Sequence, residues 1–377
     1  MEKSRIRSYL IGIGVFLLAK FKWALALLKL TKFGGTLISM GASLGAYALI
    51  YGWKFGVALV YLIFVHEMGH LIAAKRKGIP TSPAIFIPFV GALISMKQQP
   101  RDAATEAYLA YGGPLAGLIS FLPAVILYRV TEDPFWALVI FMGALLNLFN
   151  LLPVSPLDGG RIVSVLSTKI WLAGLLALIA LVIFSPSPIL FLVILFGFFT
   201  WWNRARENYR SSVLTYEKEK LTEVLAALRQ WPTLTSMLEI KQSLAHAKET
   251  ASREEEASKG KWLIPFLQDD ERLARDKARM DCEFAERMLA LLLEWEHRPV
   301  EYAESDPTRP IPSELLVGAG QIAQDRIQAI DTELHRYRTY YVASASTKWK
   351  VLAAYLLLAA VLSLFMLYGH RLMELYR

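Results

Sequence analysis

The sequence predicts an all-α polytopic membrane protein, with a helical transmembrane core, a short extended or re-entrant segment and a cytosolic helical domain. Three observations support this fold class. The mean hydropathy of the 377-residue chain is +0.37, and only 20% of its residues are charged. Its apolar residues gather in runs close to the roughly 20 residues that a helix needs to cross a bilayer core. Strand-like alternation of apolar and polar residues is scarce.

The first 33 residues contain apolar stretches that lysines interrupt, and they lack the small-residue cleavage site of a secretory signal. We predict that residues 1–33 form an amphipathic segment that lies in the membrane interface.

The transmembrane core is predicted to extend over residues 34–202. The two spans that flank the sequence SPSP (185–188) could instead form a hairpin that only partly crosses the membrane. The apolar run after SPSP is short, and Lys169 lies within the run before it. The candidate spans of the core are residues 34–52, 55–74, 105–128, 134–152, 162–184 and 188–202.

Residues 203–347 are polar and are predicted to form a cytosolic helical domain. Their apolar residues recur three, four or seven apart, as on the packed face of a helix. One stripe begins at Leu273 and a second includes Ile322 and Ile330, with a proline-rich loop at 297–312 between them. Residues 348–377 are predicted to form a C-terminal transmembrane anchor, with a span at 349–368, and a short tail.

Lysines and arginines gather beside the predicted spans, so the net charge of +8 is explained by membrane orientation and needs no nucleic-acid partner. Lys75–Lys77 follow the second span, and Arg204 and Arg206 follow the sixth. These ends are predicted to face the cytoplasm, which puts the N-terminus inside and the C-terminus outside. Cys282, the single cysteine, falls in the segment assigned to the cytoplasm, in agreement with a reducing compartment.

Residues 79–100 contain Pro83, Pro88 and Pro100 among β-branched and aromatic residues. This composition disfavours a continuous helix and favours extended or re-entrant structure. Non-helical backbone at membrane depth needs protein or water partners, so the segment is expected to line a cavity.

The second span contains the sequence HEMGH, residues 66–70. His66 and His70 are four apart on a helix, so both rings project from one face and can bind one ion, for which zinc is well suited. Glu67 would lie beside that ion, where it could act as a general base on water. A charged group in a membrane span is costly, which favours a function for this motif over a chance occurrence.

A catalytic zinc usually has three protein ligands, and the other four histidines lie in or beyond the polar block. The better candidate is Asp158, in NLFNLLPVSPLDGGR (147–161), where prolines should end the fourth span and flexible Gly159 and Gly160 follow the aspartate. Asp158 could instead cap a helix that starts near Arg161.

Other polar and small residues in the spans have simpler explanations. Asn147 and Asn150 could hydrogen-bond between helices, and Gly113 and Gly117 in GGPLAG could be close-packing positions. Glu106, at the start of the third span, could be an interfacial charge.

Together, HEMGH in one span and NLLPVSPLDGG near the end of a later one resemble the paired signatures of the site-2 protease family of intramembrane zinc metalloproteases. The resemblance covers residues 34 to about 165 and is closest to bacterial members without a recognisable PDZ or CBS domain. It implies that His66, His70 and Asp158 bind Zn²⁺, that Glu67 is catalytic, and that Asn150 helps to hold the substrate or to stabilise the oxyanion. GGPLAG is similar to the family's glycine-rich element.

The expected function is that of an intramembrane zinc endopeptidase, which hydrolyses peptide bonds in or near transmembrane segments of other proteins. The expected location is a bacterial cell membrane, with the active site near the cytoplasmic face, and the partners are the bilayer and a membrane-protein substrate. A stretch within 79–100 could bind the substrate as an added strand. The alternatives are a catalytically silent metal-binding protein or chaperone-like pseudoprotease, which would not need Glu67, and a transporter.

Overall fold

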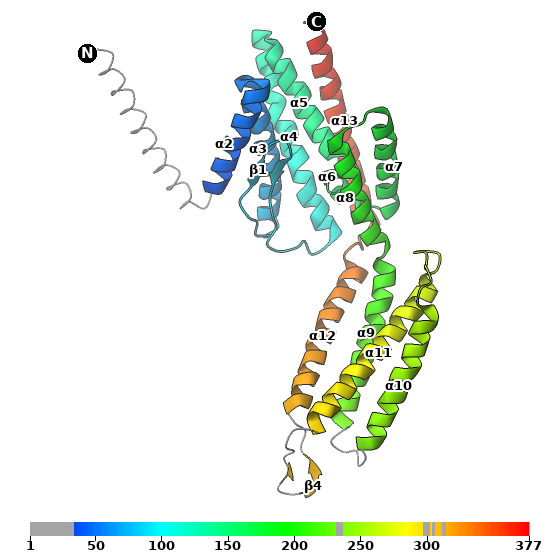
Figure 1. Ribbon diagram of the computed structural model, residues 1–377. Helices are drawn as coiled ribbons and strands as arrows, with labels where there is room; N and C mark the ends of the chain where they lie inside the picture. Colours follow the sequence, from blue (N-terminus) through cyan, green and yellow to red (C-terminus); the bar gives the residue numbers. More distant parts are fainter. Residues whose placement is uncertain (1–33, 231–236, 297–301, 304–305, 311–313, 377) are drawn as a thin grey trace, which may run out of the picture. The chain divides into compact units, whose positions relative to one another are not determined.

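The computed structural model describes residues 34–230, 237–296, 302–303, 306–310 and 314–376 (Figure 1). The predicted interfacial segment of residues 1–33 lies outside the described residues. The chain divides into two compact units, one of residues up to Trp201 and from Tyr341 onward, the other of residues Trp202–Tyr340.

The first unit is built from helices, most of which correspond to an apolar run in the sequence. Polar caps mark several starts: Asp102 accepts a hydrogen bond from the backbone of Thr105, and Asp133 accepts one from Phe135. The helices of this unit are α2 (Gly34–Tyr51), α3 (Trp53–Arg76), α4 (Ala103–Thr131), α5 (Pro134–Asn150), α6 (Asp158–Val163), α7 (Thr168–Phe184), α8 (Pro188–Ala205), which runs across the boundary between the units, and α13 (Ala345–Glu374).

Four helices among the described residues are long and apolar enough to cross a bilayer, namely α3, α4, α8 and α13. Helices α5 and α7 are apolar but shorter. The fold class predicted from the sequence is thus confirmed as an all-α polytopic membrane protein.

The core of this unit lies where α3, α4, α5 and α13 pack together. Leu62, Phe121, Ile140 and Leu362, one from each helix, are fully buried in a single cluster. Helices α3 and α4 approach most closely at Gly69, where a Cβ atom would overlap the carbonyl of Gly112. Because Leu362 lies in this cluster, α13 is part of the packed core of the first unit.

The segment between α3 and α4 contains a hairpin of β1 (Ile85–Ile87) and β2 (Gly91–Leu93), so the prediction of extended structure there is confirmed. The strands are antiparallel, with Phe86 opposite Ala92. Helix α2 covers the outer edge of β1, because the backbone N–H of Phe86 donates to Ser39 Oγ at 3.1 Å. Two-stranded hairpins need such support.

The span predicted at residues 162–184 is not one helix. Helix α6 ends at Val163, and α7 begins at Thr168 with Ser167 as its cap. The Ser167 side chain accepts a hydrogen bond from the backbone N–H of Lys169, a local signal that starts a new helix inside the apolar run.

The second unit consists of α9 (Glu207–Gln230), α10 (Met237–Ser258), α11 (Asp269–Glu296) and α12 (Glu314–Thr339), with two short strands, β3 (Tyr302–Ala303) and β4 (Asp306–Pro310), between α11 and α12. Leu292 and Ile330 are fully buried in its two apolar clusters. Ile322, which the sequence placed in the second stripe, is 73% exposed, so that stripe is not buried along its whole length.

Candidate metal centre

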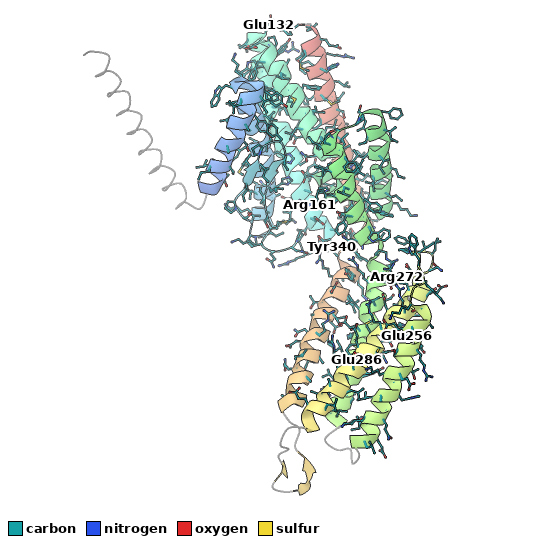
Figure 2. All side chains as sticks on the ribbon, in the orientation of Figure 1. Glu132, Arg161, Glu256, Arg272, Glu286 and Tyr340 are labelled. Atoms are coloured by element: carbon teal, nitrogen blue, oxygen red, sulfur yellow. The ribbon has the colours of Figure 1, made fainter. Side chains whose placement is uncertain are left out.

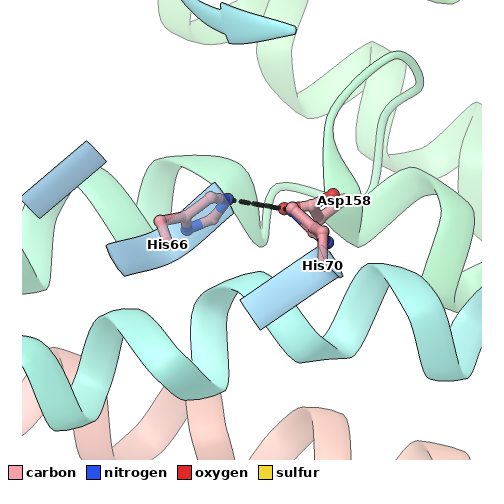
Figure 3. A group of neighbouring side chains, drawn as sticks. All are labelled: His66, His70 and Asp158. Carbon is pink, nitrogen blue, oxygen red and sulfur yellow. Dashed lines mark hydrogen bonds and ion pairs between the residues drawn. The ribbon is translucent and has the colours of Figure 1, made fainter. Parts of the chain in front are cut away.

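Three side chains from two helices converge in the first unit. Helix α3 supplies His66 and His70 from successive turns, and α6 supplies Asp158 from its first turn (Figure 3). The Nε2 atoms of the histidines are 3.2 Å apart, and each lies 3.1 Å from Asp158 Oδ2. The three residues that the sequence proposed as ligands are thus brought together.

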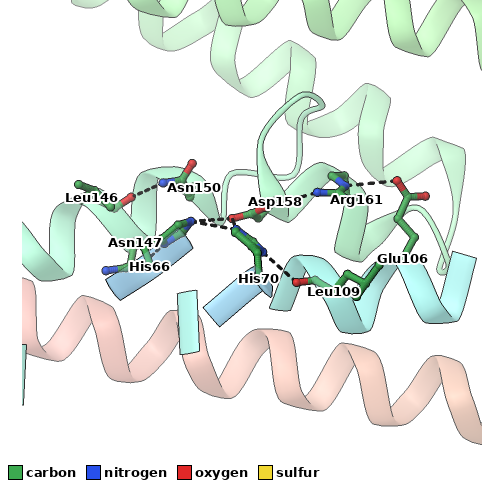
Figure 4. Close-up of polar contacts among 9 residues, drawn as sticks. All are labelled: His66, His70, Glu106, Leu109, Leu146, Asn147, Asn150, Asp158 and Arg161. Carbon is green, nitrogen blue, oxygen red and sulfur yellow. Dashed lines mark hydrogen bonds and ion pairs between the residues drawn. The ribbon is translucent and has the colours of Figure 1, made fainter. Parts of the chain in front are cut away.

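Hydrogen bonds on the far side of each ring fix which nitrogen faces the cluster (Figure 4). His70 Nδ1 donates to the carbonyl of Leu109 at 2.9 Å, and His66 Nδ1 donates to Asn147 Oδ1 at 2.7 Å. The orientation of the Asn147 amide is set in turn, because its Nδ2 donates to the carbonyl of Gly143. Both Nδ1 atoms carry the proton, so both Nε2 lone pairs point toward Asp158.

This donor set fits a zinc ion. Three lone-pair atoms that meet at 3.1–3.2 Å repel one another unless a cation lies among them. Bonds of about 2.0–2.1 Å in a tetrahedral arrangement would put the donors about 3.3 Å apart. Imidazole and carboxylate are common zinc ligands, and three of them leave a fourth position open.

Asp158 does not act as a helix cap. Helix α6 begins at Asp158 itself, and its cap position is taken by Leu157, which makes no capping hydrogen bond. The second carboxylate oxygen of Asp158 lies 4.0 Å from Arg161, whose Nε donates to Glu106 at 3.2 Å. Glu106 is therefore part of an ion pair that joins α4 to the helix carrying Asp158.

Glycines make room for these side chains. A Cβ atom on Gly113 would overlap the Nε2 atoms of both histidines, and one on Gly117 would overlap the amide of Asn147. The glycines of GGPLAG are close-packing positions, as the simpler explanation held, but the groups packed against them are the side chains of the site. Gly159 and Gly160 are not flexible linkers either, because they lie in α6 against the backbone of residues 151–155.

A cavity of about 560 Å³ adjoins the cluster. Glu67 and Asn150 both line this cavity, and neither is one of the three candidate metal ligands. Asn150 Nδ2 donates to the carbonyl of Leu146 in its own helix at 3.1 Å. Further walls come from β2, the loop before α6, and the apolar residues Ile189, Leu192, Val193 and Phe196 of α8.

Asn147 is the main feature of the site that the sequence did not assign. Its side chain is fully buried and holds His66, whereas the sequence offered it only as an interhelical contact. An asparagine in an apolar span is the signal that was available, but the partner could not be identified without the packing of α5 against α3.

Comparison with known proteins agrees on one family. Residues 54–133 and 127–195 match the family model described as Peptidase family M50. A zinc metalloprotease of Methanocaldococcus jannaschii is 33% identical over 170 residues, which cover 38% of this chain and 48% of the relative. A relative from Synechocystis sp. is 27% identical, over 54% of this chain and 62% of its own length.

Among solved structures, a site-2 protease from Methanocaldococcus jannaschii matches with 22% identity and a TM-score of 0.31, covering 44% of this chain and 86% of that one. The chain spans about half the length of the curated relatives it matches.

Proposed function

Because residues 54–133 and 127–195 match the model of peptidase family M50, we propose that this chain is a zinc endopeptidase that hydrolyses peptide bonds in or near transmembrane segments of other proteins. The observation that carries the proposal is the convergence of two imidazole nitrogens and one carboxylate oxygen beside a cavity in a membrane-spanning unit. A carboxylate that is not a ligand, Glu67, lines the same cavity.

Each residue has a distinct task in the proposed reaction. A bound zinc ion supplies Lewis acidity, which polarises the scissile carbonyl and allows water to react at neutral pH. Glu67 accepts a proton from the water whose oxygen bonds to the carbonyl carbon, and delivers it to the amide nitrogen as the C–N bond breaks. Asn150 uses one amide N–H on Leu146, and its second N–H is proposed to donate to the substrate backbone or the developing oxyanion.

Replacing Glu67 with glutamine tests this proposal. The change keeps the shape of the side chain but removes its ability to accept a proton, so zinc content should stay near one ion per chain while cleavage of a transmembrane peptide falls at least about 100-fold. His70→Ala is the contrasting variant, which should lose the zinc itself. Equal cleavage by the wild type and Glu67→Gln would reject the protease and favour the silent metal-binding alternative.

The substrate is proposed to bind as an extended strand along β2. The Phe86 N–H points to Ser39 and away from β2, so the Phe86–Ala92 pair is not the hydrogen-bonded kind, and the N–H and C=O of Ala92 point away from β1. Residues Gly91–Ile94 line the cavity that contains the proposed catalytic groups. A helical substrate would have to unwind locally to add to this edge.

A proline at position 92 tests the strand proposal, because it removes an edge N–H without removing a bond between β1 and β2. We expect Ala92→Pro to lower cleavage at least about 10-fold and to leave zinc content unchanged, whereas Ala92→Ser, which keeps the N–H, should cleave normally. Unchanged turnover in Ala92→Pro would reject strand addition. Phe86 and Ile87 are less suitable sites, since α2 covers β1 and a proline there would disturb the hairpin.

The site is proposed to lie near the cytoplasmic face of a bacterial cell membrane. Lys75, Arg76 and Lys77 close α3 little more than one turn after His70, and such basic groups are typical of cytoplasmic ends. In a Cys282→Ser background, a thiol introduced at Lys77 should react with a membrane-impermeant reagent in inside-out vesicles only. Labelling from the outside would place the site at the opposite face.

A further inference from the structure

The second unit has one end at which both of its connections to membrane helices lie, here called the junction end. Helix α9 begins there directly after α8. Helix α12 is antiparallel to α9, because Lys218 of α9 contacts Asp331 of α12, whereas Leu225, further along α9, lies beside Gly320, which comes before Asp331 in α12. Helix α12 therefore ends where α9 begins, and α13 follows it.

The loop that joins α10 to α11, residues 259–268, also lies at the junction end. Helix α11 is parallel to α9. Arg206, directly before α9, pairs with Asp269, and Tyr209 in α9 pairs with Asp276, so the partners follow the same order in both segments. The first turn of α11, and the loop before it, are thus beside the start of α9. Figure 2 shows side chains projecting outward from this loop between the labelled Glu256 and Arg272.

The loop exposes large apolar side chains that a soluble surface would seldom gather. Trp262 is 90% exposed and Leu267 is 80% exposed, with Ile264 and Phe266 about half exposed. Leu263 is buried and holds the loop against the helices. An exposed patch of this kind marks an interaction surface with a protein or a membrane.

The loop is fixed to the end of a membrane helix. The ring of Phe266 meets the ring of Trp202, a residue of α8, edge to face, with centroids 5.4 Å apart and an interplanar angle of 84°. The buried Arg206 donates to both carboxylate oxygens of Asp269, at 2.5 and 2.6 Å. Trp202 directly follows the apolar run of α8, where tryptophans commonly mark the boundary between hydrocarbon and water.

We propose that the tip of this loop, with Trp262 and Leu267, inserts into the interfacial layer of the bilayer that α8 crosses. Helix α8 exposes apolar side chains up to the residue that contacts the loop, because Phe198 and Phe199 are 48% and 65% exposed just before Trp202. Acidic residues occur on both flanks of the loop, at Glu254–Glu256 and Asp269–Glu271. Lys259 and Lys261 precede Trp262 within the loop and offset part of this negative charge, so the contact is attributed mainly to apolar insertion.

Spin-label accessibility in the full-length protein tests the proposal. In a Cys282→Ser background, nitroxides are placed at Leu267 or, as a matched control, at Leu238, which is 65% exposed in the first turn of α10, at the opposite end of the unit. Each protein is reconstituted in nanodiscs of neutral phosphatidylcholine and in nanodiscs with added anionic phosphatidylglycerol. Collision with lipid-soluble oxygen is compared with collision with a water-soluble nickel chelate.

We expect the oxygen-to-nickel collision ratio at position 267 to exceed that at position 238 at least about threefold in both lipids. Equal ratios at the two positions would show that the loop faces water and would overturn the proposal. Protection of position 267 from both reagents would also overturn it, because the loop would then be covered by protein, such as a second copy of the chain. A high ratio in anionic discs alone would contradict the apolar insertion.

Discussion

Each unit holds a cluster of polar side chains around a buried ionisable group, and the two clusters differ in their balance of hydrogen-bond donors and acceptors. In the first unit, His66, His70 and Asp158 turn three acceptor atoms toward one point, and their donors are already used on Asn147 and Leu109. With both imidazoles neutral, the converging lone pairs require a metal cation or an added proton among them. The cluster is complete only with a cation.

The cluster of the second unit is complete by itself. Arg206 donates to Asp269, and its guanidinium lies 4.0 Å from the ring centroid of Tyr209, which donates to Asp276 at 2.6 Å. The hydrogen bonds from Arg206 lower the pKa of Asp269, and burial together with the bond to Asp276 raises the pKa of Tyr209 to about 12. The Arg206 guanidinium and the Tyr209 hydroxyl thus each face a carboxylate.

This difference separates a binding site from a structural contact better than burial or charge does. Each cluster contains a buried ionisable group, Asp158 in the first and Arg206 in the second, so neither property distinguishes them. A surplus of aligned acceptors indicates a missing cation, whereas matched donors and acceptors indicate a role in holding helices together.

Removing the metal should affect only the first cluster. A strong zinc chelator is expected to abolish peptide cleavage and to increase hydrogen exchange in residues 151–163, because the repelling acceptors would then separate. The start of α11, around Asp269, should exchange at an unchanged rate. Mass spectrometry with and without added zinc measures both, and equal changes in the two regions would contradict the comparison.

A methyl group at position 113 should displace the Nε2 atoms of His66 and His70. Gly113→Ala puts a carbon atom against both Nε2 atoms, so zinc affinity should fall at least about 100-fold and cleavage with it. Gly41→Ala is the control, since a Cβ atom there has nothing within 4 Å. Competition with a fluorescent chelator gives the affinities. Full zinc binding by Gly113→Ala would mean that the histidines move aside freely.

Two asparagines on α5 should separate metal binding from turnover. Asn147→Ala removes the acceptor for His66 Nδ1 and is expected to weaken zinc binding about 10–100-fold. Asn150→Ala should retain zinc and lower kcat, if Asn150 contacts the substrate. Zinc affinity and cleavage kinetics are measured for both, and a loss of zinc in Asn150→Ala would give that residue a structural role instead.

Breaking the second cluster should cost stability but leave the metal in place. Arg206→Gln leaves Asp269 without its charged partner and should destabilise the first turns of α11 by about 1–3 kcal/mol. Hydrogen exchange there should accelerate roughly 10-fold or more, since 1.4 kcal/mol corresponds to a factor of ten. Zinc content should not change, and a fall in it would show that the clusters are not independent.

The sequence determined the features that depend on residues close together in the chain. Apolar runs predicted the helices, because crossing a bilayer requires about 20 residues and leaves few alternatives. The four-residue spacing of His66 and His70 placed both rings on one face of α3, and prolines predicted where α5 ends. The three proposed ligands could therefore be named before their geometry was known, while their roles remain predictions.

The tertiary structure decided which distant groups meet. That Asn147 holds His66, that Gly113 makes room for both histidines, and that β2 lies along the cavity depend on contacts between segments far apart in the chain. The clamp between Arg206 and Asp269, which fixes the exposed loop at the junction end, joins residues 63 apart. Local periodicity determines the face of a helix on which a residue lies, but the residue opposite that face is set only when the helices pack.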